Sequence, residues 1–308
     1  MKAAPFAYVR PGTTAEALEE LSRDGAKVIA GGQSLVPVLA MRLARPAALV
    51  DINAIEALQV LEDETAGVRI GATVRQREAQ RNPATSRVPL LRMALPWIGH
   101  RELRSRGTVC GSLAHADPAA ELPAVACSLE AAITIAGPGG ERTVAAEGFF
   151  TAAMTTSAGS EELITSVRFP HATEQQGFGF AEIGRRHGDF ALAGVAIRVE
   201  AQDPARPSAR ITCFGVSDTP VVRDDSTRLS EAVAAAGPDT PEIQIRTLLA
   251  ASAHDFATEV VDTGGDEHGS RAYRQQLIAA LSSRELARAY IRATRDGTGR
   301  TGPDQEKP

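Results

Sequence analysis

The first fifty residues alternate short apolar runs with segments of helical character, and this alternation constrains the fold more than any other feature of the sequence. The runs at 27–30 and 47–52 have the length and composition of buried strands, and the stretches 15–23 and 35–44 indicate helices. Short strands separated by helices are typical of βαβ units. We therefore expect a compact βαβ-like unit here, with two adjacent glycines at its first turn from strand to helix.

The rest of the chain predicts two further regions. Between residues 58 and 175 the expected elements are a strand turning into a helix (68–79), helices (89–99, 118–131), a hairpin around 137–140 and a strand (161–170). Asp117 is the expected N-cap of the 118–131 helix, with Pro118 in its first position. The third region is predicted to contain three strands (177–184, 190–201, 209–217) and then two helices (239–257, 270–295). The tail, 296–308, is rich in Gly, Pro and charge and is predicted to be disordered.

Composition excludes several classes of function. The formal net charge of −5 argues against nucleic acid as a partner, because phosphate binding needs a concentrated basic surface. No apolar stretch has the length of a membrane span and the N-terminus has no signal-peptide core, so we expect a cytoplasmic protein. Three cysteines without CxxC spacing predict neither a disulfide framework nor a metal or iron–sulfur site in this chain.

A second glycine-rich segment, 104–123, follows the first at a distance of about seventy residues. It places Gly107, Thr108, Gly111 and Ser112 within six positions, and small residues of this kind let backbone amides and hydroxyls approach a phosphate. Two such loops could clamp a diphosphate, although glycine turns are also common as plain structural turns. Neither segment has the GxGxxG or GxxxxGK[ST] spacing, and no nucleophile with a neighbouring base stands out, so no catalytic or metal-binding residue is expected.

Six segments carry a resemblance to a known family: PFAYVRPGTTAEAL at the start, AGGQSLVPVLAMRLARPAALVDIN (30–53), IGATVRQRE (70–78), IGHRELRSRGTVCGSLAHADPAAELPAV (98–125), GFAEIGRRHGDFALAGVA (179–196) and GVSDTPVVR (215–223). The chain resembles the FAD-binding medium subunit of molybdenum hydroxylases, the family of aerobic carbon monoxide dehydrogenase and xanthine dehydrogenase. The resemblance runs from about residue 4 to about residue 295, and its parts at 30–35 and 107–123 are highly specific.

This resemblance implies an α+β fold of the vanillyl-alcohol-oxidase (PCMH) type. Two FAD-binding subdomains, 1–57 and 58–175, are expected to hold the cofactor between them. A C-terminal domain with a three-stranded antiparallel sheet and helices is expected at 176–295.

The resemblance also implies the residues that contact FAD. The first diphosphate loop is expected to consist of Ala30, Gly31, Gly32, Gln33, Ser34 and Leu35. The second is expected to use Thr108, Gly111 and Ser112, with Glu121 near the ribose or adenine side, and Ile164 or Thr165 is expected to contact the flavin through backbone groups. In this interpretation Gly31 and Gly32 leave space for the ligand, and Ser34 is a hydrogen-bond donor.

Two positions depart from the family pattern. Cys110 stands where many relatives have glycine, and a thiol in a loop there is expected to be oxidisable. Glu182 stands where some relatives carry lysine, which argues against a cationic contact to the flavin from that strand.

The function implied by the resemblance is electron relay within a complex. A large molybdopterin-binding subunit would oxidise the substrate, a small subunit would pass electrons through [2Fe-2S] clusters, and FAD in this chain would collect them for a terminal acceptor. The expected assembly is a dimer of heterotrimers. Two alternatives are a self-contained flavin oxidoreductase of the same fold and a nucleotide-binding subunit without a redox role.

Overall fold

A computed structural model describes residues 2–186, 188–237 and 240–295, so the tail predicted to be disordered lies outside the described residues. Its N-terminal region confirms the βαβ prediction. Three parallel strands lie in the order β1-β3-β2 and alternate with two helices: β1 (Ala7–Val9), α1 (Thr14–Leu21), β2 (Ala26–Ile29), α2 (Leu35–Ala40) and β3 (Ala48–Asp51). Strand β1 was not predicted because its three residues are too short to show a pattern.

The ends of the first two helices follow from local hydrogen bonds. Helix α1 begins after Thr13, whose side chain accepts a hydrogen bond from the Glu16 amide. Helix α2 ends at Ala40, four residues before the predicted end, because Arg42 takes a left-handed conformation with a φ of 60°. The Leu43 amide then donates to the Val38 carbonyl, which is a common way to terminate a helix.

The central region is built on a five-stranded sheet in the order β4-β5-β10-β6-β7, antiparallel throughout. Its strands are β4 (Leu61–Glu64), β5 (Gly67–Gly71), β6 (Ala132–Gly137), β7 (Gly140–Ala145) and β10 (Leu163–Phe169). The predicted hairpin around 137–140 is confirmed as β6 and β7. The helices are α3 (Gln76–Arg81), α4 (Pro89–Ala94), α5 (Arg101–Arg106), α6 (Val109–His115), α7 (Glu121–Ser128) and α8 (Ala146–Phe149), and a short hairpin consists of β8 (Phe150–Ala152) and β9 (Thr155–Thr156).

The structure corrects the prediction for residues 98–131. The expected glycine loop contains helices α5 and α6, and the expected helix 118–131 begins at Glu121 and ends at Ser128. Asp117 does not cap it: its carboxylate accepts from the Ala119 amide and its carbonyl accepts from Ala120, which closes a tight turn before the helix. The left-handed backbone of Ala116, with a φ of 51°, separates this turn from α6.

The main sheet of the C-terminal region has four strands where three were predicted. The antiparallel order is β11-β12-β13-β14, with β11 (Gln176–Gly184), β12 (Ala191–Glu200), β13 (Ser208–Phe214) and β14 (Val221–Asp224). Helix α9 (Ser226–Ala236) was not predicted. The expected helix 239–257 is interrupted after Ala250, so two helices replace it, α10 (Glu242–Ala250) and α11 (Ala253–Val260). A small hairpin of two-residue strands, β15 (Gly265–Asp266) and β16 (Gly269–Ser270), precedes the last helix, α12 (Arg271–Arg295).

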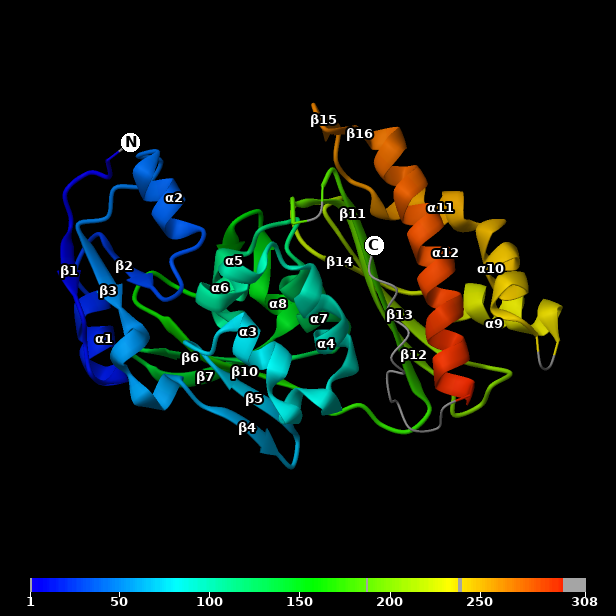
Figure 1. Ribbon diagram of the computed structural model, residues 1–308, viewed down its shortest axis with the longest axis horizontal. Coiled ribbons are helices and arrows are strands. Elements are labelled where there is room, and N and C mark those ends of the chain that lie inside the picture. The colour runs from blue at the N-terminus through cyan, green and yellow to red at the C-terminus, as the bar shows by residue number, and fades with distance from the viewer. Residues whose placement is uncertain (1, 187, 238–239, 296–308) are drawn as a thin grey trace.

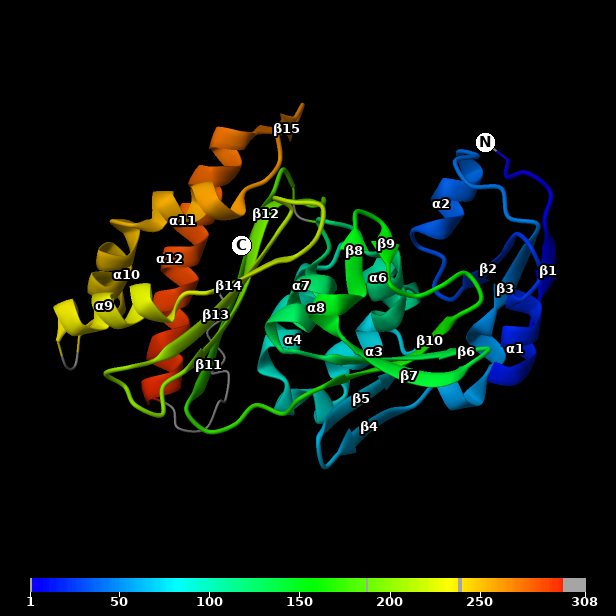
Figure 2. The ribbon, with the colours of Figure 1, turned by 180° about the vertical axis from the view of Figure 1, so that it is seen from behind.

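The three regions lie side by side, with the N-terminal sheet at one end and α12 at the other (Figures 1 and 2). The four-stranded sheet is covered on one face by α12 and on the other by α4 and α7 of the central region. Burial on both faces explains why β12 reads as a continuous apolar run. Within the described residues no helix is long and apolar enough to span a bilayer.

An aromatic cluster joins the central and C-terminal regions. The rings of Trp97 and Phe180 are 6.2 Å apart, and that of Phe180 is stacked 5.8 Å from Phe214. Gly194 lies beneath the Phe214 ring, where a Cβ atom would overlap it. The sheet and the central region are therefore held together by packing that leaves no room for larger side chains.

Candidate functional site

A cleft of about 800 Å³ has the two glycine-rich segments in its wall. One side is formed by β2 and the start of α2, and the other by α5, α6 and the start of α7, which face each other in Figure 1. Residues from 154–164 and from the turn at 188–190 complete the lining. The volume lies in the range typical of cofactor pockets, roughly 300–1,000 Å³.

The structure brings together all of the predicted site residues except one. The eleven that line the cleft are Ala30, Gly31, Gly32, Gln33, Ser34, Leu35, Thr108, Gly111, Ser112, Glu121 and Ile164. Thr165 lies outside the lining: its hydroxyl donates to the Thr134 carbonyl at 3.4 Å, and its own carbonyl accepts from the Ala72 amide at 2.9 Å. Its hydroxyl and its carbonyl thus serve the central sheet.

The two glycines of the first segment are required for different structural reasons. Gly32 has a φ of +69°, a conformation that side chains rarely adopt. Gly31 lies against the second segment, where an added Cβ atom would overlap the Arg106 carbonyl oxygen and come within 2.9 Å of the Gly107 Cα atom. Gly31 therefore provides space for the neighbouring loop, which the interpretation as space for a ligand did not anticipate.

Asn53 and Arg75 link the two segments by hydrogen bonds. The side-chain NH2 group of Asn53 donates to the Ala30 carbonyl at 2.8 Å, and its side-chain oxygen accepts from Arg75 at 2.6 Å. The Arg75 guanidinium also donates to the Arg106 carbonyl at 2.6 Å. Both glycine segments are thus held by one chain of polar contacts that ends on main-chain carbonyls.

A tyrosine and an aspartate of the N-terminal sheet support these polar contacts. The Tyr8 hydroxyl donates to Asp51, which also accepts from the backbone N–H of Asn53 at 2.9 Å. The hydrogen bond raises the pKa of Tyr8, whereas the bonds from Tyr8 and Asn53 outweigh desolvation and hold the pKa of Asp51 below its usual value. Sequence reasoning missed Asn53 and Arg75 as site residues because their partners lie 22 to 31 positions away.

The second segment is ordered by a helix cap. The Thr108 hydroxyl accepts from the Gly111 amide at 3.0 Å, and a Cβ atom at Gly111 would approach that hydroxyl within 2.5 Å. Gln76 fixes the same segment from α3, since its amide donates to the Gly107 carbonyl at 2.9 Å and its side chain to the Thr108 carbonyl at 3.3 Å. The backbone at the second glycine segment is therefore fixed on both sides.

Cys110 is a core residue. Because α6 forms, its side chain turns away from solvent and is 2% exposed, and burial raises the pKa of the thiol to about 12. The expectation of an oxidisable loop thiol is wrong, since a buried thiol with a raised pKa forms little thiolate. Although the residue touches the cleft, it is a poor nucleophile.

The charges along the described lining are mostly negative. Lys27 is the one lysine or arginine among these residues, whereas four carboxylates, Asp117, Glu121, Glu162 and Asp189, contribute to the wall. Glu162 is paired with Arg142 at 2.7 Å, and that bond, together with one from the Gly159 amide, lowers its pKa to about 2. A diphosphate in this cleft would depend on backbone amides and hydroxyls for its contacts, which the glycine segments can supply.

The turn between β11 and β12 adds a rim that the sequence did not indicate. Gly188, Asp189 and Phe190 line the cleft, and Phe190 is 74% exposed. A large exposed aromatic side chain at the mouth of a cleft is suited to contact a planar ligand.

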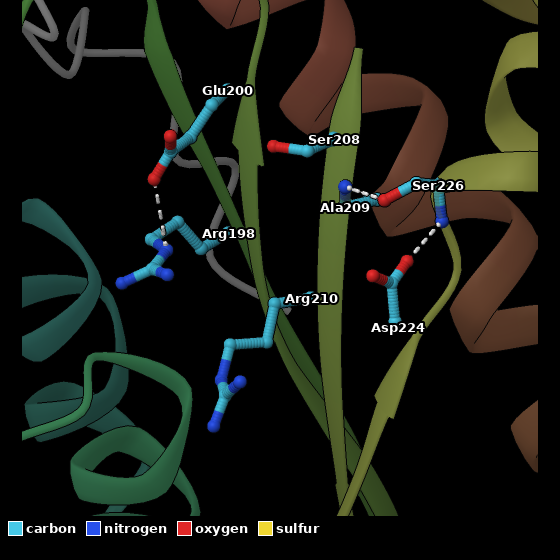
Figure 3. A pocket seen from close by; sticks show the side chains of 7 residues that line it. All are labelled: Arg198, Glu200, Ser208, Ala209, Arg210, Asp224 and Ser226. Carbon is cyan, nitrogen blue, oxygen red and sulfur yellow. Dashed lines mark hydrogen bonds and ion pairs between the residues drawn. The ribbon is translucent and has the colours of Figure 1, made fainter.

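A second hollow, of about 130 Å³, lies on the face of the C-terminal sheet (Figure 3). Its arginines are engaged with acidic residues: Arg198 pairs with Glu130 at 2.6 Å and Glu200 at 3.4 Å, and Arg210 pairs with Glu147. Because Glu130 and Glu147 belong to the central region, these ion pairs join the two regions. This hollow is therefore explained as part of a structural contact.

Nothing in the described cleft supports hydrolytic or metal chemistry. Ser34 and Ser112 make no side-chain hydrogen bond to a histidine or a carboxylate within the described chain, and no three His, Cys, Asp or Glu residues there are grouped to hold a metal ion. The geometry favours binding of an extended phosphate-containing ligand.

Comparison with known proteins agrees with this geometry. The family model described as the FAD binding domain in molybdopterin dehydrogenase matches residues 4–172. The chain is 37% identical over 297 residues to 6-hydroxypseudooxynicotine dehydrogenase complex subunit alpha of Paenarthrobacter nicotinovorans, covering 95% of this chain and 97% of that protein. It is 34% identical to caffeine dehydrogenase subunit beta of Pseudomonas sp. strain CBB1, with coverages of 95% and 97%.

Solved structures show the same similarity over nearly the whole chain. A chain of quinoline 2-oxidoreductase from Pseudomonas putida 86 superimposes with a TM-score of 0.83 at 32% identity, covering 95% of this chain and 99% of that one. Carbon monoxide dehydrogenase from Hydrogenophaga pseudoflava gives the same TM-score at 29% identity, with the same coverages. The chain therefore belongs to the FAD-binding medium subunits of the molybdenum hydroxylases and is an oxidoreductase subunit.

Proposed function

We propose that the chain binds FAD in the 800 Å³ cleft and relays electrons through it within a heteromeric complex. The observation that carries the proposal is the juxtaposition of the two glycine segments across one cleft, held by Asn53 and Arg75 through main-chain carbonyls. Fixed backbone at both segments is what a diphosphate needs when few cations are present.

The residues proposed to contact the cofactor are those of the predicted set that line the cleft. Ala30 to Leu35 would form one diphosphate loop, and Thr108, Gly111 and Ser112 the other. Glu121 and the backbone of Ile164 would lie along the remaining length of the ligand. The contact expected from Ile164 or Thr165 is assigned to Ile164 alone, because Thr165 does not line the cleft and its hydroxyl and carbonyl are engaged in the sheet.

The proposed fold type is that of the vanillyl-alcohol-oxidase (PCMH) class, with subdomains at 1–57 and 58–175 and a C-terminal domain at 176–295. The three larger sheets, one in each region, support these boundaries. The proposed location is the cytoplasm.

The proposed role of this chain is to bind, orient and tune FAD, with no acid or base of its own acting on an organic substrate. When bound, the flavin supplies the exchange between single-electron donors and a terminal acceptor that takes one or two electrons. The donors would be [2Fe-2S] clusters of a small subunit, fed by a molybdopterin-binding large subunit, in a dimer of heterotrimers. The chain's residues contribute the fixed backbone, the exclusion of water by the cleft wall and the aromatic rim at Phe190.

Reconstitution of the purified full chain with FAD tests binding. We expect quenching of FAD fluorescence, a rise in Tm with FAD concentration, and yellow colour in the supernatant after acid precipitation. Colour retained in the protein pellet would instead indicate a covalent flavin oxidase. The absence of both a spectral change and a Tm shift would indicate a subunit without flavin and would refute the proposal.

The relay is tested in the whole complex. Removal of FAD should leave substrate-dependent reduction of the iron–sulfur clusters intact while abolishing reduction of the terminal acceptor. Turnover of an organic substrate by this chain alone would contradict the relay.

A further inference from the structure

The segment 75–107 is strongly basic. It contains eight arginines and only two acidic residues, Glu78 and Glu102, in a chain whose formal net charge is −5. The segment includes α3, α4 and α5, and residues at its C-terminal end line the cleft. The overall charge of the chain therefore conceals a local concentration of positive charge next to the proposed FAD site.

Helices α3 and α5 bring part of this charge onto one surface. The two helices pack against each other (Figure 1), and the Gln76 amide at the start of α3 donates to the Gly107 carbonyl after the end of α5 at 2.9 Å. This contact makes the pair antiparallel, so the end of α3 and the start of α5 lie at the same end. Arg77, Arg81 and Arg101 are therefore neighbours, and we call them the arginine surface.

The arginine surface has no acidic counter-ions. None of its three guanidinium groups lies within 4.0 Å of a carboxylate of a described residue, whereas Arg142 and Arg223 each pair with a glutamate at 2.6 to 2.7 Å. The pKa of Arg77 is lowered, first by desolvation and then by the positive charges of Arg101 and Arg81. Gathering like charges destabilises an isolated chain, so the arrangement is typical of a surface that meets an anionic partner.

The arginine surface adjoins the mouth of the cleft. Leu103, on α5, lines the cleft and is 39% exposed. Gly188, in the aromatic rim, lies against the His100 imidazole at the start of α5, since a Cβ atom there would come within 2.7 Å of the ring. Phe190 and Leu103 thus supply exposed apolar area beside the arginines, a composition that is typical of protein–protein interfaces.

We propose that the arginine surface is the docking site of the iron–sulfur subunit that supplies electrons to FAD. The inference rests on the proposed function, because it takes the ligand of the cleft to be FAD and the electron donor to be an iron–sulfur protein. It adds the place at which that donor binds and the charge by which it is recognised.

Two properties of the donor fit this surface. A [2Fe-2S] cluster held by four thiolates is anionic, because two ferric ions do not balance two sulfides and four thiolates, and reduction adds a further negative charge. The protein surface nearest the cluster therefore has a negative potential, which attracts the three arginines. A donor must also come close to the cofactor, and α5 forms part of the cleft wall.

Site-directed cross-linking in the assembled complex identifies the neighbour of the arginine surface. The native cysteines are all buried, so a thiol-reactive photo-cross-linker attaches selectively to the thiol introduced by Arg81→Cys. We expect a product with the iron–sulfur subunit, identified by mass spectrometry. Arg246→Cys, on the exposed surface of α10, is the matched control and should give no such product. A product of Arg81→Cys with the molybdopterin-binding subunit or with a second copy of this chain, or no product, would overturn the proposal.

Charge reversal tests whether electrostatic attraction holds the donor. The double variant Arg81→Glu and Arg101→Glu changes only exposed side chains. In the whole complex at about 0.15 M salt, where charges interact over about 8 Å, we expect the rate at which substrate reduces FAD to fall about tenfold or more, because like charges then face the donor. The FAD content and Tm of the chain should stay as in wild type. Arg206→Glu with Arg246→Glu makes the same change of charge elsewhere and should keep the wild-type rate.

The outcomes separate the two proposals. FAD binding together with a wild-type reduction rate in the charge-reversal variant would overturn the docking site and leave the FAD site intact. A cross-link to the iron–sulfur subunit from a chain that binds no FAD would overturn the proposed function, because cross-linking needs no flavin. If the charge-reversal variant does not fold, the cross-link from Arg81→Cys still decides where the donor docks.

Discussion

Replacing Gly31 with alanine tests whether the spacing between the two glycine segments is set by backbone contact. The new Cβ atom would overlap the Arg106 carbonyl oxygen and lie 2.9 Å from the Gly107 Cα atom, whereas carbon atoms pack at about 3.5–4.0 Å. The obstacle is backbone on both counts, so the segments must separate by roughly half an ångström or more. The φ of Gly31 is outside the left-handed region, so steric overlap is the whole effect.

Overpacking of this kind costs about 1–3 kcal/mol of folding free energy. The hydrogen bonds that Asn53 and Arg75 make to the two segments would lengthen as well, and we expect FAD affinity to fall about tenfold or more, since displacements near 1 Å can cost about a hundredfold. Gly139→Ala is the matched control, because nothing lies within 4 Å of a Cβ atom there. Calorimetry and FAD fluorescence titration measure both effects, and wild-type Tm and Kd in Gly31→Ala would refute the reasoning.

Three further changes test other parts of the site. Arg75→Met should weaken FAD binding by about tenfold, the size of one lost charged hydrogen bond, whereas Arg81→Met, at the exposed end of the helix α3 that Arg75 precedes, should leave fluorescence titrations unchanged. Cys110 should react with a thiol reagent only after unfolding, and rapid labelling of native protein would contradict its burial. Glu162→Gln should lower Tm at pH 7, and the difference from wild type should shrink as pH falls from about 4.5 towards about 2: a depressed pKa stabilises the fold fully above the unfolded value, and this contribution, made through Arg142, is lost as pH falls through the folded pKa.

Elements with a clear periodic pattern could be predicted from the sequence. The strands β3, β6 and β12 carry runs of buried apolar residues, so their strand character is visible locally. Strand β2 is a short apolar run that is only partly buried, and β7 was predicted from the glycine turn that joins it to β6. The short edge strands β1 and β14 have three or four residues, mostly only partly buried, and are specified by pairing with a neighbour rather than by pattern.

The largest error in the predicted fold concerns the turn before α7. Asp117 followed by Pro118 fits a helix cap, and the same pair also fits a turn closed by the aspartate carboxylate. Packing of α7 against α4 and the C-terminal sheet favours the turn, so the helix starts at Glu121, three residues after the predicted start. A single sequence holds no sign of that packing.

Only the two glycine segments of the site could be predicted from the sequence. Small residues indicate a close approach of the backbone, and both segments line one cleft. That Gly31 faces Arg106, that Asn53 and Arg75 hold the segments together, and that Phe190 forms a rim all depend on contacts between distant parts of the chain. The burial of Cys110 likewise follows from helix α6, which its glycine-rich composition concealed.

The hydrogen bonds through Asn53 and Arg75 separate two properties that usually vary together in a cofactor pocket, its width and the side chains that line it. Because its outer bonds end on the carbonyls of Ala30 and Arg106, the width of the cleft is set by main-chain atoms that every amino acid carries. Side chains such as Ser34 and Ser112, whose hydroxyls hold no wall residue among those described, can then change without moving the walls. The cleft can accordingly be retuned, by evolution or by an engineer seeking a different flavin potential or an analogue cofactor, while its dimensions stay constant.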